Sequence, residues 1–108
     1  MSRQFDVLPR AQRDLDDQAW YFAENANLEI ALRFLACARA TFELLAGNPQ
    51  IGRACRIAGQ VGVRVFRVCD FEKLLVFFRV DGERVLVLRV LHGARDLEAL
   101  LRREGVLP

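Results

Sequence analysis

The fold of this chain is decided by the stretch Leu74-Leu75-Val76-Phe77-Phe78-Arg79-Val80-Asp81-Gly82-Glu83-Arg84-Val85-Leu86-Val87-Leu88. Asp81-Gly82 stands between two apolar runs, which is a strong signal for a two-residue hairpin turn. We therefore predict a strand over Leu74–Val80 and an antiparallel partner over Arg84–His92.

Neither run alternates between apolar and polar residues, as a sheet covered on one side only would. With the turn at Asp81-Gly82, the predicted pairs are Phe78 with Val85 and Val76 with Val87 on one side, and Phe77 with Leu86 and Leu75 with Leu88 on the other. Both sides are apolar. The second side has to be covered by a terminal helix and loops, by a partner segment or by a second copy.

Upstream of the hairpin, apolar residues recur at steps of three or four, which is typical of amphipathic helices. Pro9 suits the first turn of one helix, and Asn27 is a good N-cap for a second. Gly47-Asn48-Pro49 ends the second helix. Because the connection between them is short, the two helices are predicted to form an antiparallel hairpin.

The remaining segments complete an α+β order of β-α-α-β-β-β-α, expected as one domain over residues 1–108. A short strand is predicted at Phe5–Leu8, a loop over Gly52–Gly62 and a strand over Val63–Val68. Leu97, Leu100 and Leu101 indicate a short C-terminal helix. The predicted architecture is an N-terminal strand and a helical hairpin packed on a small antiparallel sheet, with that helix at the end.

The composition, 53% apolar and 28% charged, is that of a globular protein. No apolar stretch approaches the roughly 20 residues of a membrane helix, and the start has no signal-peptide pattern, so we expect a cytoplasmic protein. The net charge is only +2, which does not by itself indicate nucleic-acid binding. Three scattered cysteines, one histidine and no glycine-rich phosphate loop predict neither a metal site nor a cofactor.

Four segments, in this order, resemble the ParE toxins of the RelE/ParE superfamily. They are Leu8-Pro9-Arg10-Ala11-Gln12-Arg13-Asp14-Leu15-Asp16-Asp17, Pro49-Gln50-Ile51-Gly52-Arg53, Val63-Arg64-Val65-Phe66 and, the strongest match, Leu88-Arg89-Val90-Leu91-His92-Gly93-Ala94-Arg95-Asp96. The resemblance extends over nearly the whole chain.

The resemblance implies the toxin of a type II toxin–antitoxin pair, held inactive in a hetero-oligomer by a ParD-like antitoxin whose mostly disordered tail folds over the toxin. ParE toxins are linked to DNA gyrase, which they trap on cleaved DNA without catalysing a reaction of their own. The apolar hairpin fits an antitoxin-binding surface, for which the candidates are Leu75, Phe77, Phe78, Leu86 and Leu88. Candidates for gyrase contact are Arg53, Arg56, Arg95 and Trp20.

The alternative within the superfamily is a ribosome-dependent mRNA endoribonuclease of the RelE type. Such cleavage needs an acid–base pair and cations around the phosphate, for which the candidates are Arg79, Arg89, Arg95 and His92. The sequence offers few other residues that could complete a catalytic set. Phe78 stands where many relatives have tyrosine, Tyr21 is the only tyrosine, and no lysine follows Lys73. A third alternative is an inactive relative kept for antitoxin binding alone.

Each candidate also has a plainer interpretation. A lone histidine at the end of a strand and before a helix cap, as His92 is, more often makes a structural hydrogen bond than acts in catalysis. Arg95 and Asp96 suit an ion pair or a cap, Arg53 and Arg56 suit solvated loop charges, and Trp20-Tyr21-Phe22 suits helix packing.

Overall fold

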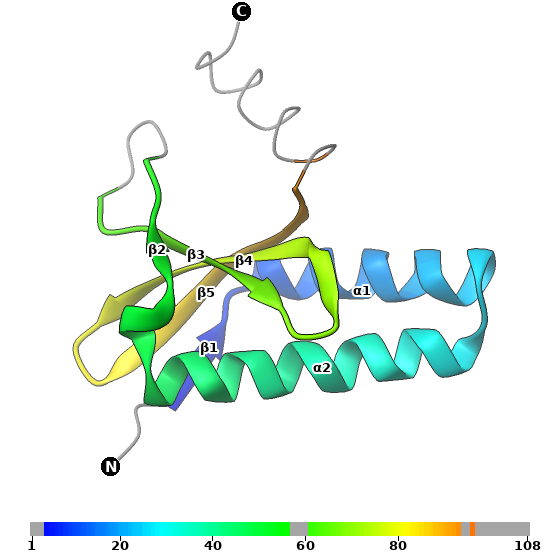
Figure 1. Cartoon of the computed structure of the whole chain (residues 1–108), viewed down its shortest axis with the longest axis horizontal. Coiled ribbons are helices and arrows are strands. Elements are labelled where there is room, and N and C mark those ends of the chain that lie inside the picture. Colours follow the sequence, from blue (N-terminus) through cyan, green and yellow to red (C-terminus); the bar gives the residue numbers. More distant parts are fainter. Residues whose placement is uncertain (1–3, 57–60, 94–95, 97–108) are drawn as a thin grey trace, which may run out of the picture.

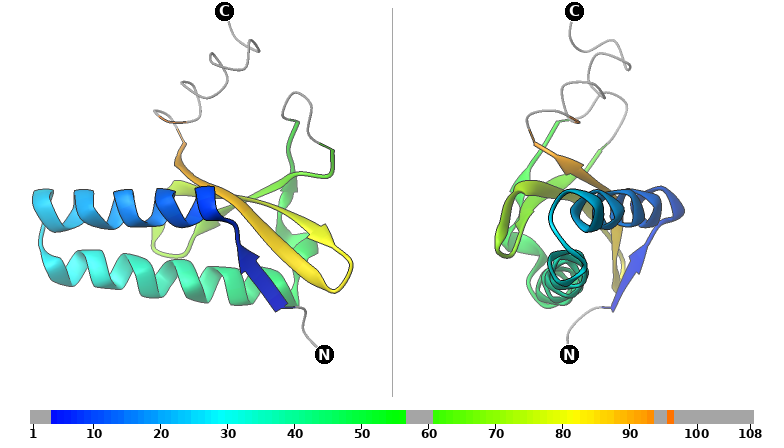
Figure 2. Two further views of the ribbon diagram at one scale, coloured as in Figure 1. Left: turned by 180° about the vertical axis from the view of Figure 1, so that it is seen from behind. Right: turned by 90° about the vertical axis from the view of Figure 1, so that its right-hand side faces the viewer.

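The computed structural model describes residues 4–56, 61–93 and 96. The elements follow the order β1 (Gln4–Val7), α1 (Pro9–Asn25), α2 (Leu28–Gly47), a 3-10 turn η1 (Pro49–Ile51), β2 (Arg53–Ala54), β3 (Arg64–Val68), β4 (Phe71–Asp81) and β5 (Arg84–His92). Both helices lie against one face of a twisted five-stranded sheet (Figures 1 and 2). The α+β prediction is confirmed. The predicted helix at Leu97, Leu100 and Leu101 lies outside the described residues.

The helical hairpin forms where local signals place it. Pro9 is in the first turn of α1, and the side chain of Asn27 caps α2 by accepting the N–H of Ile30 at 2.8 Å. Helix α2 ends at Gly47, as predicted, and Pro49 begins η1. The two helices run side by side in opposite directions (Figure 1).

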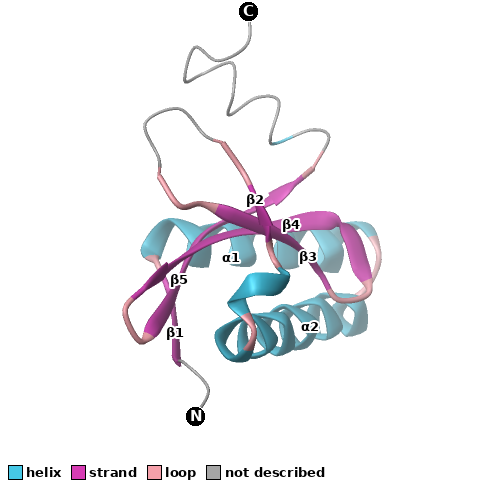
Figure 3. Cartoon of the chain, turned by 60° about the vertical axis from the view of Figure 1, so that its left-hand side comes forward, coloured by secondary structure: helices cyan, strands magenta, loops and turns pink. Residues whose placement is uncertain are grey.

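The sheet is mixed rather than purely antiparallel, which corrects the prediction. Its strand order is β1-β5-β4-β3-β2, and β1 lies parallel to β5 (Figure 3). The chain leaves β1 through both helices before it returns to the sheet, and periodicity within each segment carries no information about that long-range pairing. Strand β2 lies within the segment that was predicted as a loop. Because it is only two residues long, it has no periodic pattern that the sequence could show.

The register of the central hairpin also differs from the prediction. Asp81 pairs with Arg84, so Gly82 and Glu83 form the turn and Phe78 pairs with Val87 instead of Val85. Gly82 has a φ of +60°, which glycine adopts without strain. Moving the turn by one residue moves each partner by two, and a shift of two keeps every side chain on its predicted face.

A β-bulge then adjusts the second half of the hairpin. Phe78 pairs with Val87 but Phe77 pairs with Arg89, so Leu88 is an extra residue on β5. The bulge changes the alternation along β5. As a result Val85, Val87 and Val90 belong to the core under the helices, while Leu88 and Leu91 belong to a second cluster.

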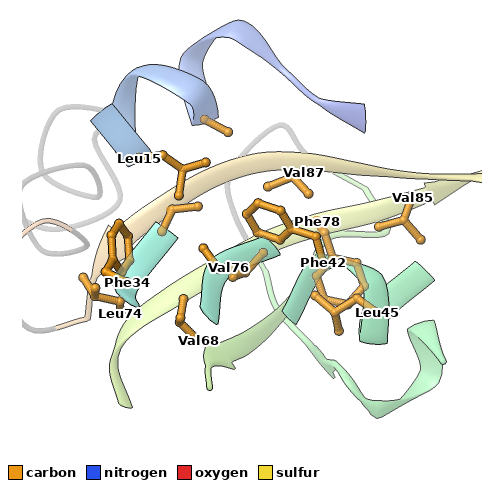
Figure 4. Packing of buried hydrophobic residues seen from close by; sticks show 13 residues of the cluster. Leu15, Phe34, Phe42, Leu45, Val68, Leu74, Val76, Phe78, Val85 and Val87 are labelled. Carbon is orange, nitrogen blue, oxygen red and sulfur yellow. The ribbon is translucent and has the colours of Figure 1, made fainter. Parts of the chain in front are cut away.

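The main core fills the space between the helical hairpin and the sheet. Phe34, Phe42 and Leu45 of α2 are buried with Val76 and Phe78 of β4. Figure 4 shows Phe42, Leu45 and Phe78 gathered in one part of this core. A smaller cluster of Val63, Val65, Phe77 and Leu91, with the half-buried Cys55, Leu75 and Leu88, lies on the other face. The predicted two-sided apolar sheet is confirmed.

Candidate functional site

The face of the sheet turned away from the helices carries most of the residues predicted to bind a partner. We call it the outer face and define it by Leu75, Phe77, Leu86 and Leu88. Phe77 is 1% exposed, because Val63, Val65 and Leu91 surround it, whereas the other three are half-buried. The centre of this face is thus already covered by the chain itself, and its accessible part is Leu75, Leu86 and Leu88.

Phe78 belongs to the opposite face. Its ring is 0% exposed in the main core, and the alternation of β4 directs it toward the helices. Its position is fixed by Gly52, where an added Cβ would lie 2.3 Å from Cζ of Phe78. A residue so enclosed cannot contact a partner, so we leave Phe78 out of the outer face.

Arginines border the outer face on the β2–β4 side. Arg53 of β2 pairs with Val65, Arg67 of β3 pairs with Leu75, and Arg79 of β4 pairs with Leu86, so all three share the face of these apolar residues. None of them takes part in the ion pairs or side-chain hydrogen bonds found among the described residues. Arg56, just after β2, is exposed, as Arg53 and Arg67 are.

Arg64 has a different role. Its Nε donates to the carbonyl of Gly52 at 2.9 Å, and its Nη2 to the carbonyl of Gln50 at 3.4 Å. These bonds hold the η1 segment against β3. Arg64 therefore positions Gly52 and Arg53 rather than offering its charge to a partner.

Arg89 is also committed within the fold. Its Nε and Nη2 donate to the two carboxylate oxygens of Asp14 at 2.8 and 3.2 Å, with side chains only 20% and 11% exposed. Asp14 in addition accepts the backbone N–H of Val90 at 3.0 Å. The pair joins α1 to β5 where β1 has ended, and its carboxylate satisfies an amide at the open sheet edge.

His92 ends β5, and its backbone N–H donates to Oδ2 of Asp96 at 2.9 Å. His92 lines a groove of about 440 Å³ between α1 and the start of β4, together with Tyr21 and Lys73. The structure thus gathers the only tyrosine, lysine and histidine of the chain. Tyr21 could not be assigned to this groove from its place in the first helix. The carboxylate of Glu72 lines the same groove beside Lys73, and Asp70, which pairs with Arg33, lines it too, so the groove has no excess of positive charge for a phosphate.

The ribonuclease candidates do not form one site. Arg79 pairs with Leu86, whereas His92 pairs with Leu74, five residues from Arg79 along β4, which separates Arg79 from His92 by roughly 17 Å. Arg89 is bound by Asp14. Arg95 lies outside the described residues. Among the described residues, no group of His, Cys, Asp and Glu could hold a metal ion.

Trp20 is 69% exposed on α1, whereas its neighbour Phe22 packs against Phe34 and Phe71 with ring centroids 5.3 Å apart in both pairs. The helix-packing interpretation therefore holds for Phe22 and not for Trp20. Across the described part of the chain, no helix is long and apolar enough to cross a membrane.

The family described as “ParE toxin of type II toxin-antitoxin system, parDE” matches residues 6–97 of the chain. The chain belongs to the ParE toxin family. Two curated ParE toxins of Caulobacter vibrioides are similar. Toxin ParE1 is 33% identical over 93 residues, which are 85% of this chain and 91% of the relative. Toxin ParE3 is 32% identical over 91 residues, 84% of this chain and 87% of the relative.

Solved structures share the fold of this ParE-family toxin. A chain of the chromosomal ParDE TA system from P. aeruginosa superposes with a TM-score of 0.67 at 22% identity, covering 84% of this chain and 96% of that one. A chain of the toxin-antitoxin complex RelBE2 from Mycobacterium tuberculosis gives 0.54 at 21% identity, with 85% and 99% covered. The resemblance that was based on the four sequence segments is confirmed. These segments contain both residues of the Asp14–Arg89 pair and the glycine of the Gly52–Phe78 contact.

Proposed function

We propose that this ParE-family toxin is a non-catalytic poison of DNA gyrase in the cytoplasm, neutralised by a ParD-like antitoxin in a hetero-oligomeric complex. The observation that supports this best is the family match over residues 6–97. The dispersal of the ribonuclease candidates agrees with it, because RNA cleavage needs its acid, base and cations around one phosphate. In this fold Arg79 and His92 lie at opposite ends of the hairpin and Arg89 is paired.

The proposed antitoxin surface is the accessible part of the outer face, Leu75, Leu86 and Leu88. Half-buried apolar side chains beside arginines that have no ion pair within the described part of the chain suit a segment that carries both apolar and acidic residues. For gyrase, the proposed contacts are Trp20, Arg53 and Arg56, all exposed. Tryptophan and arginine are the residue types that contribute most at protein interfaces. Arg95 is retained as a gyrase candidate from the sequence.

A labelling experiment in cells separates the two modes of toxicity. After induction of the toxin, incorporation of labelled thymidine and of labelled leucine is followed over the first minutes, with and without the antitoxin. A gyrase poison stops DNA synthesis first and leaves translation running, and the antitoxin restores DNA synthesis. An early loss of leucine incorporation with new cuts in translated messages would instead establish a ribonuclease. Normal growth after expression of the toxin alone would show an inactive relative.

Two variants and one control sharpen this experiment. Because His92 is proposed to be structural, His92→Ala should stop thymidine incorporation as the unchanged toxin does, provided that its circular dichroism is native. Trp20→Ala should weaken the effect, whereas Leu32→Ala, which removes an exposed apolar side chain from α2, should not. Complete loss of toxicity in folded His92→Ala would contradict a non-catalytic mechanism.

A further inference from the structure

A groove of about 400 Å³ follows the outer edge of β3. The half-buried Phe66 and Leu75 contribute apolar surface to it, the buried Val65 and Val68 also line it, and Ile51 of η1, 41% exposed, forms part of its wall. The groove borders the outer face at Leu75. It therefore extends the surface proposed for the antitoxin and adds arginine side chains and an open strand edge to it.

Two arginines border this groove, and neither has a side-chain partner among the residues that the structure describes. Arg53 lies opposite Val65, and Arg67 is two residues beyond Val65 on the same strand, so the two are diagonal neighbours on one face. Neither is among the ion pairs of the described residues, whereas Arg33, Arg39, Arg84 and Arg89 all are.

The acidic residues of the groove do not cancel this charge. Asp70 faces Arg33 at 3.6 Å, which leaves Glu72 as the other carboxylate against Arg53 and Arg67. The groove thus carries a local excess of positive charge over an apolar floor. That combination is complementary to an acidic segment with apolar side chains.

The backbone of β3 at this edge also determines which N–H and C=O groups face a bound segment. In the ladder between β2 and β3, the N–H of Cys55 donates to the carbonyl of Val63 at 2.9 Å, and Arg53 pairs with Val65. By the alternation of an antiparallel ladder, the next edge-facing residue is Arg67. Its would-be partner Ile51 lies in η1, outside the sheet. Farther on, the N–H of Cys69 is already bonded to Oγ1 of Thr41 at 3.0 Å.

We propose that this groove binds an extended acidic segment of the antitoxin. An apolar side chain of the segment enters between Ile51 and Leu75, its carboxylates pair with Arg53 and Arg67, and its main chain meets the edge-facing N–H and C=O of Arg67. The inference rests on the proposed function for the identity of the partner. It also gives a mechanism of neutralisation, since the segment covers Arg53, one of the proposed gyrase contacts.

The test is the affinity of the cognate antitoxin for the full-length toxin carrying Arg53→Glu and Arg67→Glu together. We expect Kd to rise at least about 100-fold, since each charged hydrogen-bonded pair accounts for roughly a factor of ten. Raising NaCl from about 0.05 to 0.5 M should weaken the unchanged complex more than the variant complex, because screening acts on the lost pairs. The control is Arg10→Glu with Arg13→Glu, the same charge change on an exposed part of α1, for which Kd should change less than about threefold.

Charge reversal in the antitoxin completes the test. Replacing one acidic residue of its toxin-binding segment by arginine should restore affinity for the groove variant and not for the control. Equal losses in the two toxin variants, or no loss in either, would overturn the inference while leaving antitoxin binding intact. A groove variant that binds antitoxin normally but no longer poisons gyrase would overturn it too and assign the groove to gyrase. Failure of the unchanged toxin to bind any antitoxin would instead refute the proposed function.

Discussion

Gly52 lies against the ring of Phe78 in a space that admits no side chain. A Cβ at this position would be 2.3 Å from Cζ and 2.7 Å from Cε1 of Phe78, and that ring is fully buried in the main core. The carbonyl of Gly52 is also held by Arg64. Close approach, and not a special φ, is the reason for glycine here, since its φ is −72°.

We therefore predict that Gly52→Ala lowers the free energy of unfolding by about 1–3 kcal/mol, the usual consequence of overpacking a core. Urea denaturation measures it. Gly93→Ala is the matched control, because its Cβ would meet only the end of the Leu75 side chain at 3.3 Å and the carbonyl of Lys73 at 3.5 Å. A Gly52→Ala variant as stable as Gly93→Ala would contradict the close contact.

Asp14 attaches α1 to β5. Removing its carboxylate by Asp14→Ala leaves the guanidinium of Arg89 and the N–H of Val90 without their acceptor. In a mostly buried pair this costs about 2–4 kcal/mol. Asp17→Ala on the same helix is exposed and should change stability by less than about 0.5 kcal/mol. Equal denaturation midpoints for the two variants would show that the pair contributes nothing.

At the scale of elements, the hydroxyl of Thr41 joins α2 to the β3–β4 turn. Oγ1 of the buried Thr41 donates to the carbonyl of Cys37 at 2.7 Å and accepts the N–H of Cys69 at 3.0 Å. Thr41→Val keeps the volume but leaves this amide unsatisfied, so we predict a loss of about 1–3 kcal/mol. Amide hydrogen exchange should show Cys69 deprotected in Thr41→Val and protected in Thr41→Ser. Protection in both would mean that water or another group replaces the hydroxyl.

An ion pair between Asp6 and Arg84 links β1 to β5, and we expect its contribution to stability to depend on pH. Arg84 bonds the carboxylate of Asp6 and donates from Nη1 to Gln4 at 2.9 Å. The hydrogen bond from Arg84 holds the pKa of Asp6 below its ordinary value. A carboxyl whose pKa is lowered by folding stabilises the folded state above the ordinary Asp pKa, about 3.9, and loses that contribution as pH falls through the lowered pKa.

Asp6→Asn should accordingly be less stable than the unchanged chain at pH 7, by a small amount since both side chains are more than 40% exposed. The difference should shrink as pH falls below about 4 and vanish below the folded pKa. Thermal unfolding at several pH values measures it. A difference that stays constant down to pH 2 would mean that the ion pair is not its cause.

What the sequence could predict at this scale follows from how local each signal is. The helix limits at Pro9, Asn27 and Gly47 are set by residues within one turn, and the apolar faces of the hairpin by a period of two, so both were predictable. The parallel pairing of β1, the bulge at Leu88 and the two-residue β2 depend on contacts far apart in the chain. For the same reason, the sequence could nominate Arg89 but not its partner Asp14, and it could not place Tyr21 beside His92.

At the scale of the whole molecule, side chains protect parts of the sheet edges, the β3 edge at Arg67 stays open, and one apolar face is accessible. The amides of Val90 and His92 at the edge of β5 are bonded by Asp14 and Asp96, and the amide of Cys69 by Thr41. Such protection limits uncontrolled strand pairing. In this account the outer face and the β3 groove receive the antitoxin, while the exposed side of α1 around Trp20 and the arginines beside β2 reach gyrase.

The proposal that the toxin poisons gyrase is tested most directly by a supercoiling and DNA-cleavage assay with purified gyrase, plasmid and toxin, with and without the antitoxin. We predict that the toxin makes linear, cleaved plasmid accumulate in the presence of ATP, and that an equimolar antitoxin abolishes this. His92→Ala should behave like the unchanged toxin. Gyrase activity and cleavage unaffected by a toxin that still arrests growth would contradict the central claim.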